Sequence, residues 1–213
     1  MSADAARDRI LSLTAKMPAP TRAQGQRRAL VIYTVAVLSM AIVFQAAGGV
    51  AHSSGRPFGY TLFIAAGATT LAIIASLGAF GRGGTMGGRS RQALVAMAFA
   101  VPLVTLGWLV AWNGQYTEPF ARIGYRCLAL TVVLGGALLG AATLIRRRTV
   151  AATPTASGAA FGAAAGAWAG VGVDLWCPLT NAMHAGIGHV APMFLLVGIG
   201  ALLGHFVLRV RAH

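Results

Sequence analysis

The chain has 213 residues, of which 57% are hydrophobic and only 10% are charged, with 17 lysines and arginines against 4 acidic residues. A chain this apolar is not intrinsically disordered, and it has too few polar side chains to cover a soluble domain. The basic excess alone would suit a nucleic-acid-binding protein, whereas an integral membrane protein explains both the basic excess and the scarcity of charge.

Six apolar runs follow one another along the chain, and none of them contains Asp, Glu, Lys or Arg. They cover residues 29–50, 58–80, 93–112, 127–145, 157–173 and 190–207. A helix of this length crosses roughly 30 Å of hydrocarbon, and backbone groups in lipid must be hydrogen-bonded within their own segment. The sequence therefore predicts an all-α integral membrane protein with six transmembrane helices.

The basic residues are divided unequally between the loops. The predicted organisation is a tail over residues 1–28, a six-helix transmembrane domain over 29–208 and a C-terminus over 209–213. Fourteen basic residues fall in the tail, the second and fourth loops and the C-terminus, which all lie on one side. The other side carries three, Arg56, Arg122 and Arg126. Because cytoplasmic loops are enriched in Lys and Arg, we predict that both termini are cytoplasmic.

The tail contains a candidate amphipathic helix over residues 4–17. Ala6, Ile10, Leu13 and Met17 recur at a spacing that places them on one helical face. A helix this short is marginal alone in water. The four residues are therefore candidates for docking into a groove of a cytosolic partner or onto the anionic inner leaflet. A disordered, positively charged leader is the alternative.

Thiol, imidazole and carboxylate side chains gather at the outer ends of the later spans. Cys127 opens the fourth span, Cys177 follows the fifth, and Asp174, His184 and His189 lie nearby in the sequence. These are ligand types for soft or borderline metals, and the outer face of a bacterial membrane also permits a disulfide. Three interpretations remain open: structural burial, a redox-active or disulfide-forming pair, and a transient metal ion at Cys127 and Cys177.

Two details bear on this group. The five-residue separation of His184 and His189 is unfavourable for one face of an α-helix. Asp174 lies at the edge of the membrane, where a carboxylate is a functional candidate. Its structural alternative is an ion pair with Arg122 or Arg126.

The fifth predicted span carries glycines four residues apart, at Gly158, Gly162, Gly166 and Gly170. Shorter sets occur in the sixth span at Gly200 and Gly204, and in the fourth at Gly135, Gly136 and Gly140. Small residues on one face let another helix approach closely within a membrane. We therefore expect spans four to six to form a tight sub-bundle. The interface is either pure packing or one that shifts and carries an outer event inward.

The sequence offers no support for an enzyme. It contains no nucleotide-binding loop, nucleophile elbow or metalloprotease motif. Transporters usually place charged groups or helix breaks in mid-span, and the centres of these spans are nearly featureless.

Four features of the second half resemble a known family. They are the Arg126–Cys127 pair, the Cys177–Pro178 pair, the glycine-rich fifth span and the closing helix with Gly200 and Gly204. This pattern is similar to the NrsF family of polytopic anti-sigma factors. The resemblance covers residues 122–208, and over residues 1–121 only the six-span layout and the short leader match.

The resemblance implies a regulator in the bacterial inner membrane that keeps an extracytoplasmic-function sigma factor from RNA polymerase. It implies docking through the tail 1–28, release by a stress signal at the outer Cys127 and Cys177, and no direct contact with nucleic acid. Two other functions stay open. One is a small transporter or channel, and the other is a membrane thiol redox protein with both cysteines within disulfide reach.

Overall fold

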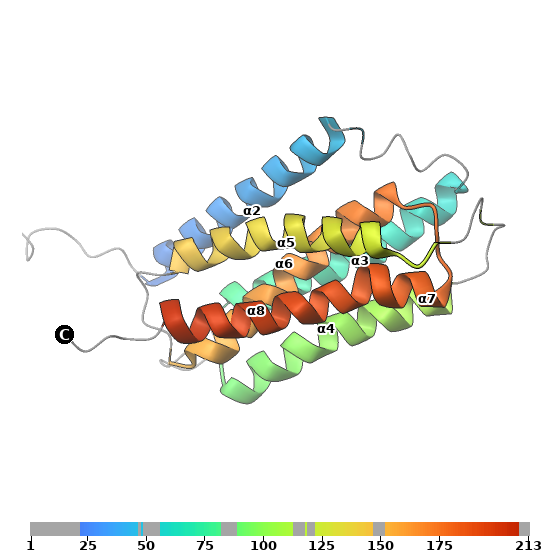
Figure 1. Cartoon of the computed structure of the whole chain (residues 1–213). Helices are drawn as coiled ribbons and strands as arrows, with labels where there is room; N and C mark the ends of the chain where they lie inside the picture. Colours follow the sequence, from blue (N-terminus) through green and yellow to red (C-terminus); the bar gives the residue numbers. More distant parts are fainter. Residues whose placement is uncertain are drawn as a thin grey trace, which may run out of the picture.

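The computed structural model describes residues 22–46, 48, 56–81, 89–112, 118, 122–146 and 152–208, and over these residues it is helical with no strand. The helices are α2 (Arg22–Ala46), α3 (Phe58–Phe80), α4 (Arg91–Ala111), α5 (Tyr125–Arg146), α6 (Pro154–Trp176), α7 (Ala182–His184), the π-helical segment η1 (Ala185–Val190) and α8 (Ala191–Val207) (Figure 1). Six helical segments are long and apolar enough to cross a membrane. The predicted six-span, all-helical architecture is confirmed to this extent, and its sidedness stays a prediction.

The first and last spans extend beyond their predicted limits. Helix α2 begins at Arg22 instead of residue 29, and the last apolar segment begins at Ala182 instead of 190. At the start of α2, long basic side chains can keep their charges in the headgroup region. The helix can therefore continue past the hydrocarbon without burying a charge. The tail residues Ala6, Ile10, Leu13 and Met17 and the C-terminus 209–213 lie outside the described residues.

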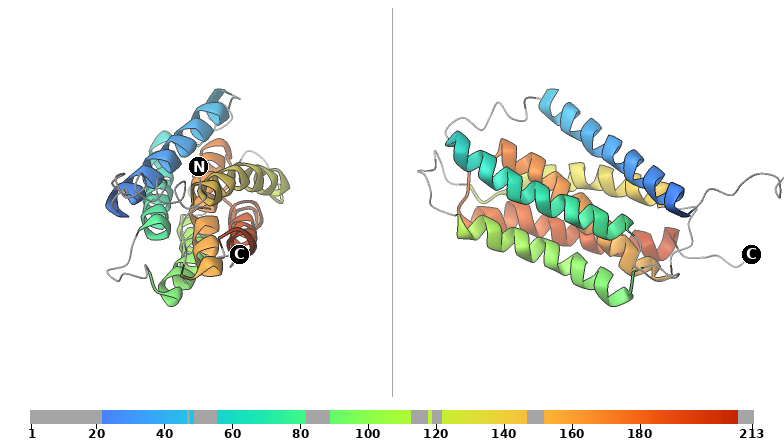
Figure 2. Two further views of the ribbon diagram at one scale, coloured as in Figure 1. Left: turned by 90° about the vertical axis from the view of Figure 1, so that its left-hand side faces the viewer. Right: turned by 180° about the vertical axis from the view of Figure 1, so that it is seen from behind.

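Helix α6 is the centre of the bundle, and α3, α4, α5 and α8 pack around it (Figure 2). Its most apolar window is 78% buried, whereas the windows of the other five spans are 17–39% buried. The reason is its composition, because alanine and glycine dominate this helix and let four neighbours approach its backbone closely. Ala160, Ala163 and Ala164 are completely buried as a result.

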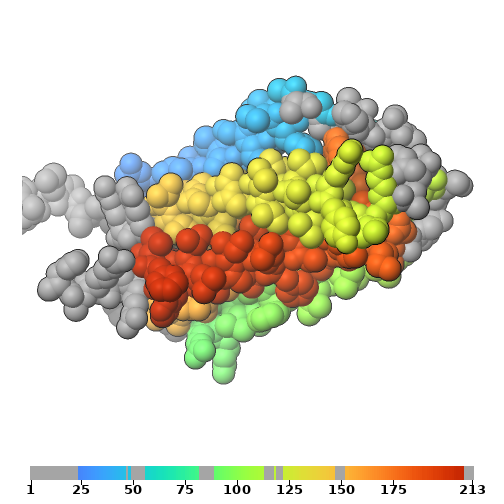
Figure 3. All heavy atoms as spheres, viewed as in Figure 1, coloured from blue at the N-terminus to red at the C-terminus, as the bar shows by residue number. Residues whose placement is uncertain are grey.

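The outer helices present apolar side chains to the surroundings. Helices α5 and α8 lie side by side on one face, with α2 and α4 at its edges (Figure 3). Ile42, Val133, Leu202 and Phe206 are all more than 60% exposed on these helices. Lipid tails solvate such side chains, so the exposed apolar surface fits a bundle embedded in a bilayer.

The glycines of α6 bring its backbone against that of α8. A Cβ added at Gly158 would overlap the carbonyl oxygen of Gly200, and one added at Gly162 would overlap the carbonyl oxygen of Leu196. A Cβ at Gly204 would in turn overlap the carbonyl oxygen of Pro154. The two helices are therefore in direct backbone contact along this half of α6.

Farther along α6, the contact changes from backbone to side chain. Gly166 faces the backbone and side chain of Met193, and Gly170 faces only the end of that side chain. A methionine side chain adapts its shape easily. The contact between α6 and α8 is thus rigid at one end and adaptable toward the other.

The glycines of α5 do not repeat this pattern, which corrects one expectation. Gly135 faces the side chain of Leu196, but a Cβ added at Gly136 or Gly140 would meet nothing within 4 Å. The two lie on the outer side of α5, away from α6 and α8. Close packing in this bundle also involves α3 and α4, so it is not confined to spans four to six.

Candidate metal and thiol site

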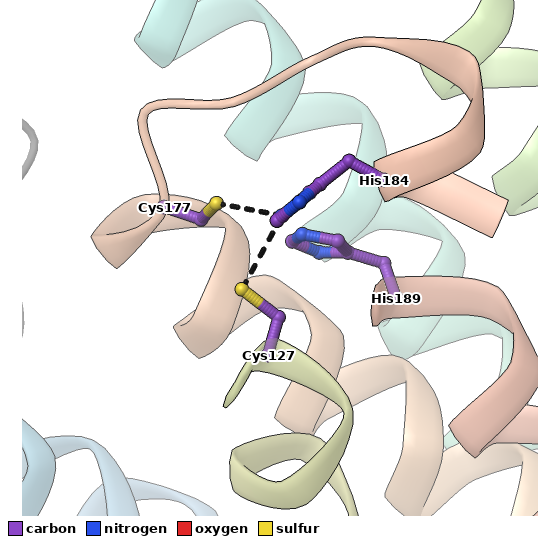
Figure 4. A group of neighbouring side chains, drawn as sticks. All are labelled: Cys127, Cys177, His184 and His189. Carbon is purple, nitrogen blue, oxygen red and sulfur yellow. Dashed lines mark hydrogen bonds between the residues drawn. The ribbon is translucent and has the colours of Figure 1, made fainter. Parts of the chain in front are cut away.

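Cys127, Cys177, His184 and His189 converge at the end of the bundle opposite the start of α2 and the end of α8 (Figures 1 and 4). One ligand atom from each side chain can be chosen so that all four atoms lie within 4.8 Å of one another. All four residues are buried. Residues as far apart in the sequence as Cys127 and His189 thus form one compact group of two thiols and two imidazoles.

Each member of this group comes from the end of a helix. Cys127 lies in the first turn of α5. Cys177 directly follows α6, and its amide donates to the carbonyl of Val173 at 2.8 Å. His184 ends α7, and His189 lies in η1. A change at the group therefore acts on the ends of α5 and α6 and on the start of the last span together.

A π-helical turn brings the two histidines together. The amide of Ala191 bonds to the carbonyl of Gly186, five residues earlier, and the histidine ring centroids are 5.5 Å apart. In an α-helix, residues five apart diverge by about 140°, which is why this spacing was expected to be unfavourable. The expectation was wrong because the backbone here is π-helical. Pro192 is the available sequence signal, because it lacks the amide that an α-helix needs at that position.

The surroundings of His184 fix a proton on its Nδ1 atom. Its Nδ1 donates to the carbonyl oxygen of Arg122 at 2.9 Å, since a carbonyl can only accept. The Nε2 atom then faces the sulfurs of Cys177 at 3.1 Å and Cys127 at 3.4 Å. Asn181 caps the helix by accepting the amide of His184 at 2.9 Å. Backbone carbonyls orient metal-binding histidines in the same way.

Glu118 anchors the segment that leads from Cys177 to His184. Its carboxylate accepts hydrogen bonds from the amide and hydroxyl of Thr180 and from the side-chain amide of Asn181. Partial burial acts against ionisation, but the hydrogen bonds from Asn181 and Thr180 outweigh it and lower the pKa of Glu118 below its ordinary value. Sequence reasoning missed this residue, although it is one of only four acidic residues in the chain.

Asp174 lies beside the group of four and not within it. Arg56 Nη1 donates to the carbonyl oxygens of Asp174 at 2.7 Å and Cys177 at 3.0 Å, and its Nη2 lies 3.5 Å from Asp174 Oδ1. In the part of the chain that the structure describes, the ion pair of Asp174 is with Arg56, which corrects the expected pairing with Arg122 or Arg126. The short loop before α3 brings this arginine to the end of α6.

The donor set matches what a tetrahedral metal site requires. Zn²⁺ takes thiolates and imidazoles at bond lengths that put neighbouring ligand atoms about 3.3–3.8 Å apart. The two distances from His184 Nε2 to the sulfurs are already close to this range, and Cu⁺ also favours thiolates. The four ligand atoms lie within 4.8 Å of one another, so a bound ion would draw them closer together.

The same surroundings activate one of the thiols. A hydrogen bond from Cys127 lowers the pKa of the Cys177 thiol, burial opposes this effect, and His184 and His189 lower the pKa further. A thiolate is both the metal-binding form and the oxidisable form of cysteine. Both cysteines are free in this structure, so metal binding and disulfide formation are each chemically accessible.

A family model described as NrsF, negative regulator of sigma F, matches residues 13–210. The match confirms the family resemblance and extends it through the first half of the chain. No curated protein and no solved structure matches the chain.

Proposed function

Because the chain belongs to the NrsF family, the negative regulators of sigma F, we propose that it is a membrane-bound anti-sigma factor of the bacterial inner membrane. It sequesters a sigma factor of the extracytoplasmic-function type through its tail 1–28. A signal at Cys127 and Cys177 releases the sigma factor. Regulation of a sigma factor follows from the family, and the sigma-factor type, the tail and the signal are our proposal.

The convergence of two thiols and two imidazoles carries the proposal for the signal. Cys127, Cys177, His184 and His189 belong to three separate parts of the bundle, and their shared position links those parts. A bound metal ion would tie all of them together. A disulfide between the two cysteines would tie α5 to the end of α6. Either event changes the packing at this end from four separate side chains to one cross-link.

The contact between α6 and α8 supports transmission along the bundle. Both helices run from the thiol and imidazole group to the opposite end, where α2 begins (Figure 1). Backbone contact at Gly158 and Gly162 leaves no side chains to absorb a displacement, so a shift of one helix moves the other. The adaptable Met193 lies near the signal end, where the first movement would occur.

The distribution of basic residues supports the sidedness. With the basic loops in the cytoplasm, the group of two thiols and two imidazoles faces the extracytoplasmic side, where metal ions and oxidants arrive first. The tail, with Ala6, Ile10, Leu13 and Met17 on one predicted helical face, then lies in the cytoplasm with its partner.

Co-purification of a sigma factor with the full chain tests the docking part. Replacing Ile10, Leu13 and Met17 together by aspartate should abolish capture, because three charges replace the apolar anchors. The matched control replaces Leu11, Ser12 and Ala15, on the opposite side of the same predicted helix, by aspartate and should retain capture. Capture that survives the first triple substitution, or loss in both, would contradict docking through this face.

Equilibrium binding of Zn²⁺ and Cu⁺ to the reduced full chain in detergent tests the signal part. We expect one ion per chain, lost in Cys177→Ser and His184→Gln and retained in His205→Gln, because His205 is exposed at the far end of α8. If no ion binds, the disulfide version requires that oxidation blocks alkylation of both thiols and reduction restores it. Failure of both measurements would exclude the proposed signal.

A further inference from the structure

A second feature of the bundle is a cavity of about 310 Å³ between α3, α4 and α6. It lies beside the group of two thiols and two imidazoles, and His189 belongs to both. Its walls are mostly apolar and include Ala68, Leu71, Ala167 and Val171. The volume is at the lower end of the range of small-molecule sites, about 300–1,000 Å³. An apolar cavity of this size accommodates a ring with the first part of an alkyl chain.

Five polar side chains line the same cavity. Thr70 and Thr105 donate their hydroxyls to carbonyls of their own helices, and the other three are Trp108, Asp174 and His189. Each of these three has buried polar atoms that make no hydrogen bond within the described residues, namely the indole Nε1, the carboxylate Oδ2 and both imidazole nitrogens. Asp174 is only 4% exposed and His189 only 2%. A buried polar atom without a hydrogen bond is unfavourable, so a ligand that supplies the missing bonds is stabilised in this cavity.

The polar groups specify a neutral ligand. Asp174 is already paired with Arg56 through Oδ1, so a charged ligand would upset the balance of this buried pair. Trp108 offers a donor, the carboxylate offers an acceptor, and His189 serves as either. A ligand head with accepting oxygens bonds to Trp108 and His189, and the same head in its hydroxyl form also donates to Asp174 Oδ2.

The cavity opens sideways between α3 and α4. Ile74 on α3 and Val104 on α4 line it and are 58% and 52% exposed on the surface that these apolar helices turn outward. In a bilayer this surface faces lipid tails, so the ligand enters from the membrane and is lipid-soluble.

We propose that this cavity binds a lipid-soluble quinone or its quinol. The oxygens of a quinone ring accept from Trp108, and the hydroxyls of a quinol donate to Asp174 Oδ2, with His189 bonding to either form. The apolar walls hold the ring and the start of the alkyl chain. His189 belongs both to this cavity and to the group of four ligands, and its two ring nitrogens allow one to serve each site.

Photocross-linking of the full chain with an azido-substituted short-chain ubiquinone analogue tests the proposal. Labelling should map to α3 and α4, saturate, and be displaced by decylubiquinone. Ala68→Phe fills the cavity and should abolish labelling. Trp108→Phe keeps the aromatic shape but removes the N–H, and it should weaken displacement by decylubiquinone about tenfold.

A second cavity supplies the matched control. It has nearly the same volume, about 320 Å³, it lies between α2, α3 and α6, and no carboxylate or imidazole lines it. Ala41→Phe fills this cavity and should leave labelling unchanged. Equal labelling of wild type and Ala68→Phe would overturn the proposal. Displacement by decylcyclohexane as effective as that by decylubiquinone would also overturn it, since only an alkyl chain would then be recognised.

Discussion

Replacing Gly162 by alanine tests whether backbone contact between α6 and α8 holds the bundle together. The added Cβ would overlap the carbonyl oxygen of Leu196 and would lie 2.7 Å from its carbonyl carbon and 2.8 Å from Cα of Val197. Ordinary contact between such atoms begins at about 3.4 Å, so the helices must separate by at least about 0.7 Å. Neither helix can yield by rotating a side chain, because all three obstructing atoms are backbone atoms.

We expect this substitution to lower the free energy of unfolding by about 1–3 kcal/mol, the usual cost of overpacking a core. The measurement is thermal unfolding of the purified full chain in detergent. Two controls separate contact from composition. Gly198→Ala on α8 adds a methyl group where nothing lies within 4 Å, and Gly170→Ala meets only the mobile end of Met193. An equal midpoint for Gly162→Ala and Gly198→Ala would refute the reasoning.

Three further predictions concern the signal end and the sidedness. Arg56→Met leaves the buried carboxylate of Asp174 without its cation and should destabilise the chain by about 3–5 kcal/mol in thermal unfolding, with Arg56→Lys less affected. Glu118→Gln should remove the contribution of this carboxylate to the pH dependence of the free energy of unfolding. Because the pKa of Glu118 is lowered in the folded chain, its stabilisation is present above the ordinary carboxyl pKa of 4.5 and is lost as the pH falls through the folded value, so the two unfolding curves should converge in acid. Parallel curves would contradict this. With both native cysteines replaced by serine, Ser53→Cys should react with a membrane-impermeant maleimide in intact cells and Thr85→Cys should not, and the reverse pattern would invert the proposed topology.

The sequence was sufficient to predict the number and approximate positions of the spans, because a lipid bilayer imposes a length and a composition that the apolar runs display directly. It was less informative about their ends. Arg27 and Arg28 indicated the edge of the hydrocarbon, but α2 begins earlier, at Arg22. Basic side chains tolerate the headgroup region, so the edge of the hydrocarbon does not end a helix.

The site was predictable in residue type and unpredictable in geometry. Cys127 and Cys177 were expected at one face from their positions at span ends. The approach of His189 to His184 depends on the π-helical turn, which no α-helical periodicity reveals. From the sequence, Arg56 could be assigned only to a loop. Its ion pair with Asp174 joins positions 118 residues apart and arises from the packing of α3 against α6, which no local pattern reveals.

The composition of α6 has a consequence for how the protein enters the membrane. The mean hydropathy of its most apolar window is 1.2, whereas the other five spans reach 2.0–2.2. Alanine and glycine make this helix suitable for the centre of the bundle, but they give it little affinity for hydrocarbon on its own. During biogenesis, the helix that every neighbour needs is thus the least able to remain in the bilayer alone. Its insertion depends on helices already present or arriving with it, so assembly of the bundle and insertion of α6 become a single event.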